Sequence, residues 1–362
     1  MAVPQLYSPA VEEHADNEAQ VVNDILAMMA STQQANADRH RHAHRDAHAK
    51  SHAIVKARLN VHDGLAPEFA QGIFAAPRSY EVVVRLSSSP GDIHSDKIPA
   101  PRGFATKIIG VDGERLLPEL GGNNQDFLMV NFPVLAFGTV GKYKSMLALL
   151  EKNANAPDFF QKLVAGSARL AEDVVEALGD TPGATLQGLA RDNNHMLGET
   201  FHTQAAVRYG DYIAKLSWAP KSANVRALTG KPVQVDEFST MRDVIVDYFR
   251  ANGAEYELRA QLCADLETMP VEDASVQWDE AISPQVPIAT LTIEPQDAAS
   301  PARRIYGDDV LSFNPWNGVE AHRPLGSIMR VRKPAYERST AFRHTENAVD
   351  RVEPDTLELI PN

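Results

Sequence analysis

The chain carries two kinds of hydrophobic pattern, and the change from one to the other divides it into regions. From residue 10 to about 37, apolar side chains recur every three to four residues, which predicts an amphipathic helix. Beyond a segment rich in histidine and arginine, 39–52, the period changes to two. Four segments then predict strands separated by glycine, proline and aspartate: 54–61, 80–87, 104–111 and 126–131.

The second half of the chain repeats this mixture of periods. Helical patterns cover 141–153, 158–178 and 240–252, and a further helix carries Tyr336. Strand patterns cover 203–209, 212–218, 256–263 and 288–293. The proline-rich stretch 284–301 predicts a connection along the surface, and 308–322 predicts irregular structure. Many antiparallel strands with inserted helices favour an α+β fold built on a curled or closed sheet.

Composition restricts the classes of function. The 362 residues have a formal net charge of −13, which argues against nucleic acid or an anionic membrane as the main partner. A single cysteine excludes an intrachain disulfide and any CxxC site. Because no apolar run approaches the roughly 20 residues of a membrane helix and no signal peptide is evident, we expect a cytoplasmic protein without a membrane span.

The segment from Arg332 to Tyr336, followed by Arg343, is the most distinctive chemical feature. On a helix, these three positions fall within a narrow arc of one face. Their guanidinium groups could hold the phenol as an anion. A tyrosine phenol titrates near pH 10, so metal ligation as phenolate at neutral pH requires stabilising the anion by roughly 4 kcal/mol. A close arginine and ferric iron can supply that. The alternative is a structural tyrosine in an arginine-rich helix.

Six of the 12 histidines lie between His40 and His62. If the first helix continued through this region, His44, His48 and His52 would lie on one face and could chelate zinc or nickel. No HExxH motif or completing carboxylate accompanies them. A solvated basic segment, or one histidine acting as an acid/base group beside a cofactor, are the alternatives.

Several segments in order resemble the haem catalases. Residues 45–50 are similar to the family's Arg-x-x-His-Ala-Lys-Gly, with Ser51 in place of the glycine. Further matches are Val-Arg-Leu-Ser-Ser at 84–88, Pro-Arg-Gly-Phe-Ala-Thr-Lys at 101–107, Gly-Asn-Asn at 122–124, and the Arg332–Tyr336–Arg343 set. Residues 313–326 look like the shorter catalase-related haem peroxidases. The resemblance spans most of the chain.

This resemblance implies a single haem b domain over residues 1–362, built on a closed antiparallel β-barrel. Its parts would be an N-terminal helical arm (1–40), a barrel with inserted helices (about 45–300), a wrapping connection (about 300–321) and the tyrosine helix (322–346). A barrel of about eight strands has room for one ligand-sized group at its mouth, which is where we expect the cofactor. By analogy with the family, the arm would serve a homo-oligomer.

The resemblance also implies a role for each site residue. Tyr336 would be the iron ligand, kept ionised by Arg332. His48 would be the distal base, Ser87 would fix its tautomer, and Asn123 would donate a hydrogen bond to the peroxide. Three arginines would pair with the haem propionates: Arg45, Arg85 and Arg343. Phe137 is the candidate for the ring stacked on the haem, whereas Arg102 and Lys107 are expected to be surface charges.

Departures from the family pattern bear on the substrate. Ala47 stands where typical catalases carry valine, and Leu128 and Met129 stand where they carry phenylalanine. A wider pocket follows, which favours organic or lipid hydroperoxides with an organic reductant, and weak catalase activity. The alternatives are dismutation of hydrogen peroxide, rearrangement similar to that of allene oxide synthases, and a non-enzymatic metal or haem binder that uses the histidine cluster.

Overall fold

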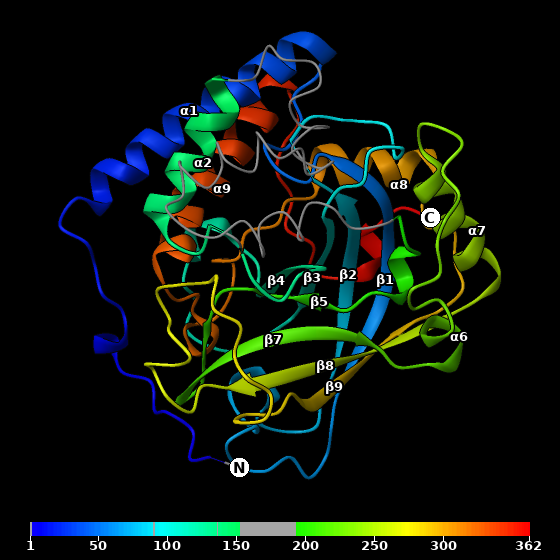
Figure 1. Cartoon of the computed structure of the whole chain (residues 1–362). Coiled ribbons are helices and arrows are strands. Elements are labelled where there is room, and N and C mark those ends of the chain that lie inside the picture. The colour runs from blue at the N-terminus through cyan, green and yellow to red at the C-terminus, as the bar shows by residue number, and fades with distance from the viewer. Residues whose placement is uncertain (1, 90, 136, 153–192) are drawn as a thin grey trace.

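The computed structural model describes residues 2–89, 91–135, 137–152 and 193–362. Its centre is a twisted antiparallel sheet whose ends meet (Figure 1). The strands are β1 (Lys50–Val61), β2 (Ser79–Ser88), β3 (Arg102–Ile109), β4 (Asn124–Val130), β5 (Phe201–His202), β6 (Val207–Tyr209), β7 (Tyr212–Pro220), β8 (Ala254–Leu262) and β9 (Val286–Ile293). The order is β5-β4-β3-β2-β1-β9-β8-β7-β6, and the pairing of β5 with β7 closes a ring of eight strands that leaves β6 outside. The expectation of a closed antiparallel barrel is confirmed.

Helices surround this barrel. The longer ones are α1 (Glu18–His40), α2 (Val140–Lys152), α7 (Thr240–Ala251) and α9 (Ser327–Glu346), and the short ones are α6 (Ala223–Arg226) and α8 (Pro301–Ile305). Single turns occur at Pro9–Val11, Gly72–Phe74, Pro118–Leu120, Met196–Gly198, Tyr306–Val310, Glu320–His322 and Leu357–Leu359. In Figure 1, α1, α2 and α9 form a layer on one side of the barrel. None of the described helices is long and apolar enough to cross a membrane.

Side chains fill the inside of the barrel. One face of each strand contributes to a single apolar cluster that includes Val55, Val84, Phe104 and Met129. The rings of Phe104, Phe201, Trp218 and Tyr256 meet there at centroid distances of 5.1–6.0 Å. Apolar side chains of the described strands therefore occupy the interior of the barrel.

Several predicted boundaries need correction. The first helix begins at Glu18, not at residue 10, and it ends at His40, where Arg41 adopts a left-handed conformation. Residues 203–209 form no single strand, since β5 ends at His202 and β6 begins at Val207. The stretch 284–301 contains β9 and is therefore only in part a surface connection. The predicted helix at 158–178 lies outside the described residues.

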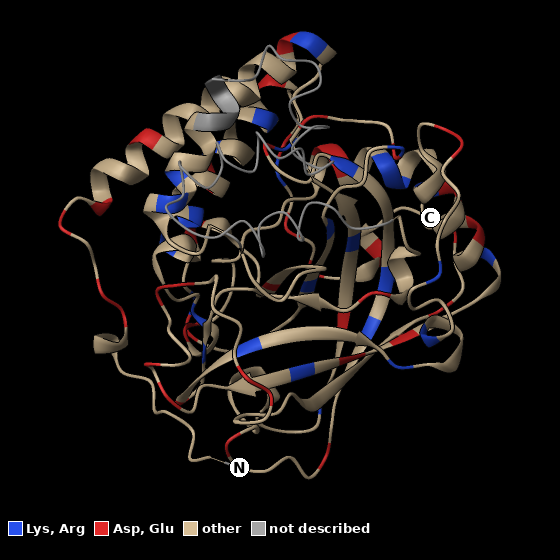
Figure 2. Cartoon of the chain, viewed as in Figure 1, with Lys and Arg blue, Asp and Glu red and all other residues tan. Residues whose placement is uncertain are grey.

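Buried charge connects the C-terminal segment to the barrel. Lys107 on β3 is fully buried, contrary to the expectation of a surface charge, and Arg102 is buried as well. The Lys107 ammonium lies 2.8 Å from Asp126 on β4 and 2.7 Å from Glu353 near the C-terminus. Asn124 and Asn317 also donate to Glu353. Acidic and basic residues are also found on the strands, as well as over the loops and helices (Figure 2).

We expect Lys107→Met to lower the free energy of unfolding by about 3–5 kcal/mol, because Asp126 and Glu353 would lose the cation that neutralises them in a buried position. Urea denaturation monitored by circular dichroism measures the change. Lys97→Met, at an exposed lysine, is the matched control and should change the value by less than about 0.5 kcal/mol. Equal stability of the two variants would contradict a stabilising role for the Lys107 network.

Candidate functional site

A cavity of about 690 Å³ lies outside the barrel, between the outer face of β2–β4 and the helical layer. Two cross-strand rows form its floor, Arg85–Ala105–Leu128 and Ser87–Gly103–Val130. Because side chains alternate along a strand, these residues point away from the barrel core that their neighbours fill. The expectation of a site at the mouth of the barrel is therefore wrong.

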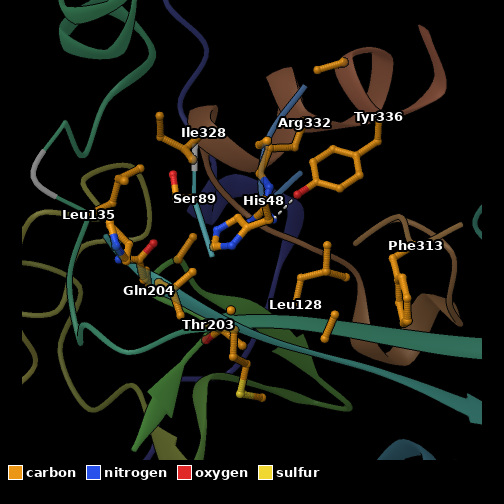
Figure 3. Close-up of a pocket in the computed structure, with 18 of the residues that line it drawn as sticks. His48, Ser89, Leu128, Leu135, Thr203, Gln204, Phe313, Ile328, Arg332 and Tyr336 are labelled. Carbon is orange, nitrogen blue, oxygen red and sulfur yellow. Dashed lines mark hydrogen bonds between the residues drawn. The ribbon is translucent and has the colours of Figure 1, made fainter. Parts of the chain in front are cut away.

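Helix α9 covers this floor with the face that the sequence predicted. Arg332, Tyr336 and Arg343 all line the cavity, together with Ser339 one turn beyond the tyrosine. The Arg332 Nη2 atom donates a hydrogen bond of 2.8 Å to the Tyr336 hydroxyl oxygen (Figure 3). A guanidinium at this distance stabilises negative charge on that oxygen relative to the neutral phenol.

An ion-pair cluster fixes the start of α9. Arg330 contacts the carboxylates of Glu12, Glu18 and Glu272 at 2.7–2.9 Å. Glu272 also accepts a hydrogen bond of 2.8 Å from the Ser327 amide, which satisfies a free amide at the helix N-terminus. The N-terminal segment and the 272 loop therefore help to set the position of the helix that carries Arg332 and Tyr336.

His48 stands on the floor of the cavity in a strained conformation. Its φ is +52°, which is uncommon for a residue other than glycine and is typical of functional sites. Arg85 donates a hydrogen bond of 2.9 Å to the His48 carbonyl and so holds this turn. The Ser87 hydroxyl lies 3.4 Å from His48 Nδ1, a long contact. A Cβ at Gly103 would lie 2.7 Å from both groups, so only glycine leaves room for the ring.

The surroundings of His48 keep its ring neutral. Burial lowers the pKa of His48 to about 3, and the positive charges of Arg85 and Arg332 act in the same direction. A neutral imidazole can accept a proton from a bound molecule at neutral pH.

Three arginines converge at the end of the cavity beside Tyr336. Arg45 donates to the carbonyls of Gly307 and Leu311, and Arg343 to those of Asp308 and Asp309. These carbonyls hold the side chains in place, but they do not neutralise them. The nearest carboxylate oxygen, on Asp308, lies 3.7–3.8 Å from Arg45 and Arg85.

The three arginines concentrate buried positive charge, which the Asp308 carboxylate offsets in part through its ion pairs with Arg45 and Arg85. Burial lowers the pKa of Arg343 to about 8, and the charges of Arg45 and Arg85 lower it further. Burial also lowers the pKa of Arg85 to about 9, and the charge of Arg45 acts in the same direction. A guanidinium stays protonated in proteins, so these shifts reflect the cost of burying mutually repelling cations. The Nε atoms of Arg85 and Arg343 are buried without a hydrogen-bond partner. The cluster therefore fits an anionic group with two carboxylates, and the phenol of Tyr336 could ligate a metal beside it.

Asn123 does not belong to this site. It is exposed, one residue before the start of β4, whereas the cavity meets the opposite end of that strand from Leu128 onward. Its prediction as the hydrogen-bond donor to a peroxide is wrong, because the length of β4 separates it from His48. The Gly-Asn-Asn segment instead ends in the buried Asn124, which donates a hydrogen bond to Glu353.

The histidine cluster also differs from its helical interpretation. Since α1 ends at His40, His44, His48 and His52 do not share a helix face. His48 lies in the cavity, and His52 lies buried in β1, 2.7 Å from the Ser88 hydroxyl. No group of three or more histidine, cysteine, aspartate or glutamate side chains in the described ranges is arranged to hold a metal ion.

Four cavity residues were not singled out by the sequence patterns. Asp46 and Tyr143 add a carboxyl and a phenol, Phe313 lies beside Tyr336, and Gln204 lies beyond His48 (Figure 3). Gln204 has a positive φ of +62°, a signal that only the backbone reveals. Phe137, the predicted stacking ring, lines the cavity near Leu135 in the loop before α2.

Comparisons with known proteins bear on the fold. No protein-family model matches the sequence, and no curated protein matches it. Solved structures do match. A bacterial catalase aligns with a TM-score of 0.60 at 14% identity over 94% of this chain and 63% of its own. A fungal catalase aligns with a TM-score of 0.58 at 15% identity over 86% of this chain and 61% of its own. Catalase A from Saccharomyces cerevisiae aligns with a TM-score of 0.57 at 13% identity over 97% of this chain and 71% of its own.

The chain has the fold of the catalases. It spans between 61% and 71% of the length of these three structures. At identities of 13–15% the likeness concerns the fold alone, and the chemistry has to be argued from the residues in the cavity.

The low pKa of His48 predicts a pH dependence of stability. The folded pKa of about 3 lies below the value of about 6.5 for an unfolded chain, so between these limits only the unfolded state binds the proton. The contribution of His48 to the free energy of unfolding therefore falls by up to about 1.4 kcal/mol per pH unit as the pH drops from 6.5. Urea denaturation of the haem-free protein at pH 6.5, 5.5 and 4.5 measures it.

In this experiment, His48→Gln should flatten the slope by that amount, because glutamine does not titrate. A slope unaffected by His48→Gln would show that the ring is hydrated and titrates normally in the folded protein.

Proposed function

We propose that this chain is a haem-dependent hydroperoxidase that cleaves the O–O bond of organic hydroperoxides, with weaker action on hydrogen peroxide. The proposal is carried by one observation: a single cavity unites the Arg332–Tyr336 pair, the neutral His48 and three cationic arginines. These are the groups needed to ligate an iron, to move a proton and to bind two propionates. The catalase fold of the chain supports the same reaction class by analogy.

The cavity residues divide into those that hold haem b and those that act on the substrate. The Tyr336 oxygen would ligate the iron, Arg332 would stabilise the phenolate, and the propionates would bind to the arginine cluster, defined as Arg45, Arg85 and Arg343. Bound haem supplies the iron whose oxidation provides the electrons for O–O cleavage. Phe313, beside Tyr336 in Figure 3, and Phe137 are the aromatic rings available to pack on the macrocycle.

His48 carries the proton transfer. Its neutral imidazole takes the proton of the hydroperoxide O–H and returns it to the oxygen that leaves as water or alcohol, which requires reach of about 3 Å in each step. Arg85 holds the backbone of this residue, and Ser87 lies next to its second nitrogen. Asn123 has no part in this step, since it lies outside the cavity.

The shape of the cavity favours organic substrates. Ala47 and Leu128 line it, and aliphatic side chains at these positions leave space that larger aromatic side chains would fill, whereas the Met129 side chain packs into the barrel core. An organic reductant then completes the peroxidase cycle. Dismutation would instead require a second hydrogen peroxide as the reductant, and rearrangement would consume no reductant.

Haem binding should depend on propionate charge. Haem dimethyl ester keeps the ring and the iron but has no carboxylate, so we expect it to bind about tenfold or more weakly than haem, because charge-assisted hydrogen bonds to the arginine cluster are lost. Absorbance titration of haem-free protein measures both affinities. Arg343→Met should weaken haem binding and leave the ester unaffected.

Tyr336→Phe is the complementary variant. It removes the proposed iron ligand and should weaken haem and ester alike, with loss of the high-spin tyrosinate spectrum. Normal haem binding with an unchanged spectrum in Tyr336→Phe would contradict the assignment of Tyr336 as the iron ligand. Equal affinity of the wild-type protein for haem and for its dimethyl ester would contradict the assignment of the arginine cluster as the propionate site.

His48→Ala should keep the haem spectrum and lower kcat/KM for peroxide by about 10²–10⁴-fold, because it removes the acid/base group while Tyr336 and the arginine cluster remain. Steady-state kinetics with tert-butyl hydroperoxide and hydrogen peroxide measures this effect and the substrate preference. We expect the wild type to favour the organic peroxide. A large preference for hydrogen peroxide would instead support dismutation, and conversion of a hydroperoxide without any reductant would support rearrangement.

A further inference from the structure

The cavity extends past His48 into a second lobe, on the side away from Tyr336 and Phe313. In Figure 3, Tyr336 and Phe313 lie to one side of His48, and Leu135 and Gln204 to the other. We call the second region the amide lobe and define it by Leu135, Thr203, Gln204, Ala205 and Gln277. The two lobes are backed by different apolar clusters. Leu128 and Phe313 pack with Ile54 and Val83, whereas Leu135 and Ala205 pack with Ala274 and Met329.

Gln204 presents a fixed acceptor to this lobe. Its backbone has a φ of +62°, a conformation that costs energy for any residue with a side chain. The amide nitrogen donates a hydrogen bond of 2.6 Å to the carbonyl of Val134. This bond fixes the plane of the amide and uses one of its two N–H groups, so the carbonyl oxygen remains an acceptor available to a ligand.

Thr203 presents a donor beside it. The buried Thr203 hydroxyl oxygen accepts a hydrogen bond of 3.1 Å from the Leu216 amide. That bond uses a lone pair of the oxygen and leaves the hydroxyl proton to be donated. Adjacent residues therefore offer one acceptor and one donor to the same lobe, with exposed Gln277 at its edge.

Positive charge in the cavity is concentrated beside Tyr336, where Arg332 donates to the phenol oxygen, although the other terminal nitrogen of Arg332 lies 3.4 Å from Met329 Sδ behind the amide lobe. Among the described lining residues, the cations are Arg45, Arg85, Arg332 and Arg343, and none of them belongs to the amide lobe. A carboxylate placed beside Thr203 and Gln204 would lose its hydration without gaining a counter-ion, and it would face the Gln204 carbonyl oxygen. A neutral group that both donates and accepts would satisfy both residues.

We propose that the amide lobe binds the far end of the substrate, and that this end is a neutral hydroxyl or carboxamide, not a carboxylate. The inference rests on the proposed function for the hydroperoxide end of the substrate, which reacts beside His48. The substrate class is then an organic hydroperoxide with an apolar chain and a neutral hydrogen-bonding terminus. Thr203 and Gln204 act as specificity residues.

The test uses ligands that cannot react. Three molecules share one alkyl chain, carry a hydroxyl in place of the hydroperoxide, and end in a carboxamide, a methyl ester or a carboxylate. Isothermal titration calorimetry on the haem-loaded protein gives their dissociation constants. We expect the carboxamide to bind at least about tenfold more tightly than the carboxylate, with the ester between them because it can only accept.

Two variants locate the preference. Gln204→Met keeps the length of the side chain and removes the acceptor, and Thr203→Val removes the donor. Each should reduce the advantage of the carboxamide over the carboxylate to about threefold or less. Gln234→Met, at an exposed glutamine elsewhere, should keep the wild-type ratio. Carboxylate binding as tight as that of the carboxamide in the wild type, or a ratio unchanged in both lobe variants, would overturn the proposal.

These measurements separate the two levels of inference. A protein that cleaves hydroperoxides but does not distinguish the three ligands would refute the amide lobe and leave the proposed function intact. A protein that distinguishes them in the predicted order but cleaves no hydroperoxide would refute the proposed function and retain the lobe as a binding site for a neutral terminus.

Discussion

Buried positive charge on the outer wall of the barrel is the constraint on which the rest of the site depends. Arg45, Arg85 and Arg343 come from a loop, a strand and a helix that are far apart in the sequence, and they repel one another where they meet. Backbone carbonyls of the 307–311 turn hold them in place without neutralising them. A dianionic cofactor would remove this cost, so the arrangement couples cofactor binding to the stability of the whole wall.

The same wall connects charge to proton transfer. Arg85 belongs to the arginine cluster, and it also holds the strained turn at His48 through the backbone carbonyl. Its charge, with that of Arg332, helps to keep the imidazole neutral. The Tyr336 side and the His48 side of the cavity are thus linked by a few side chains on β2 and α9.

Some features followed from local patterns in the sequence. The arc of Arg332, Tyr336 and Arg343 is a property of helical periodicity, and α9 has that geometry. The pairing of Arg85 and Ser87 on one face follows from the two-residue period of β2. Asn123 was misplaced because its motif fixes a turn but not the end of the sheet at which the turn lies. The conditional helical interpretation of the histidine cluster fails because α1 ends at His40, an end that periodicity alone did not mark.

The sequence by itself determined the alternation of the strands, the helical face of α9 and the fold class, because these depend on contacts between near neighbours in the chain. Tertiary structure alone decided that the site lies outside the barrel, because the apolar faces of eight strands fill the interior and leave the opposite face of β2–β4 to the helices. It also decided that Lys107 is buried and that Gln204 faces the cavity. Both depend on segments distant in sequence, the C-terminal Glu353 and the Val134 carbonyl, whose positions no local pattern encodes.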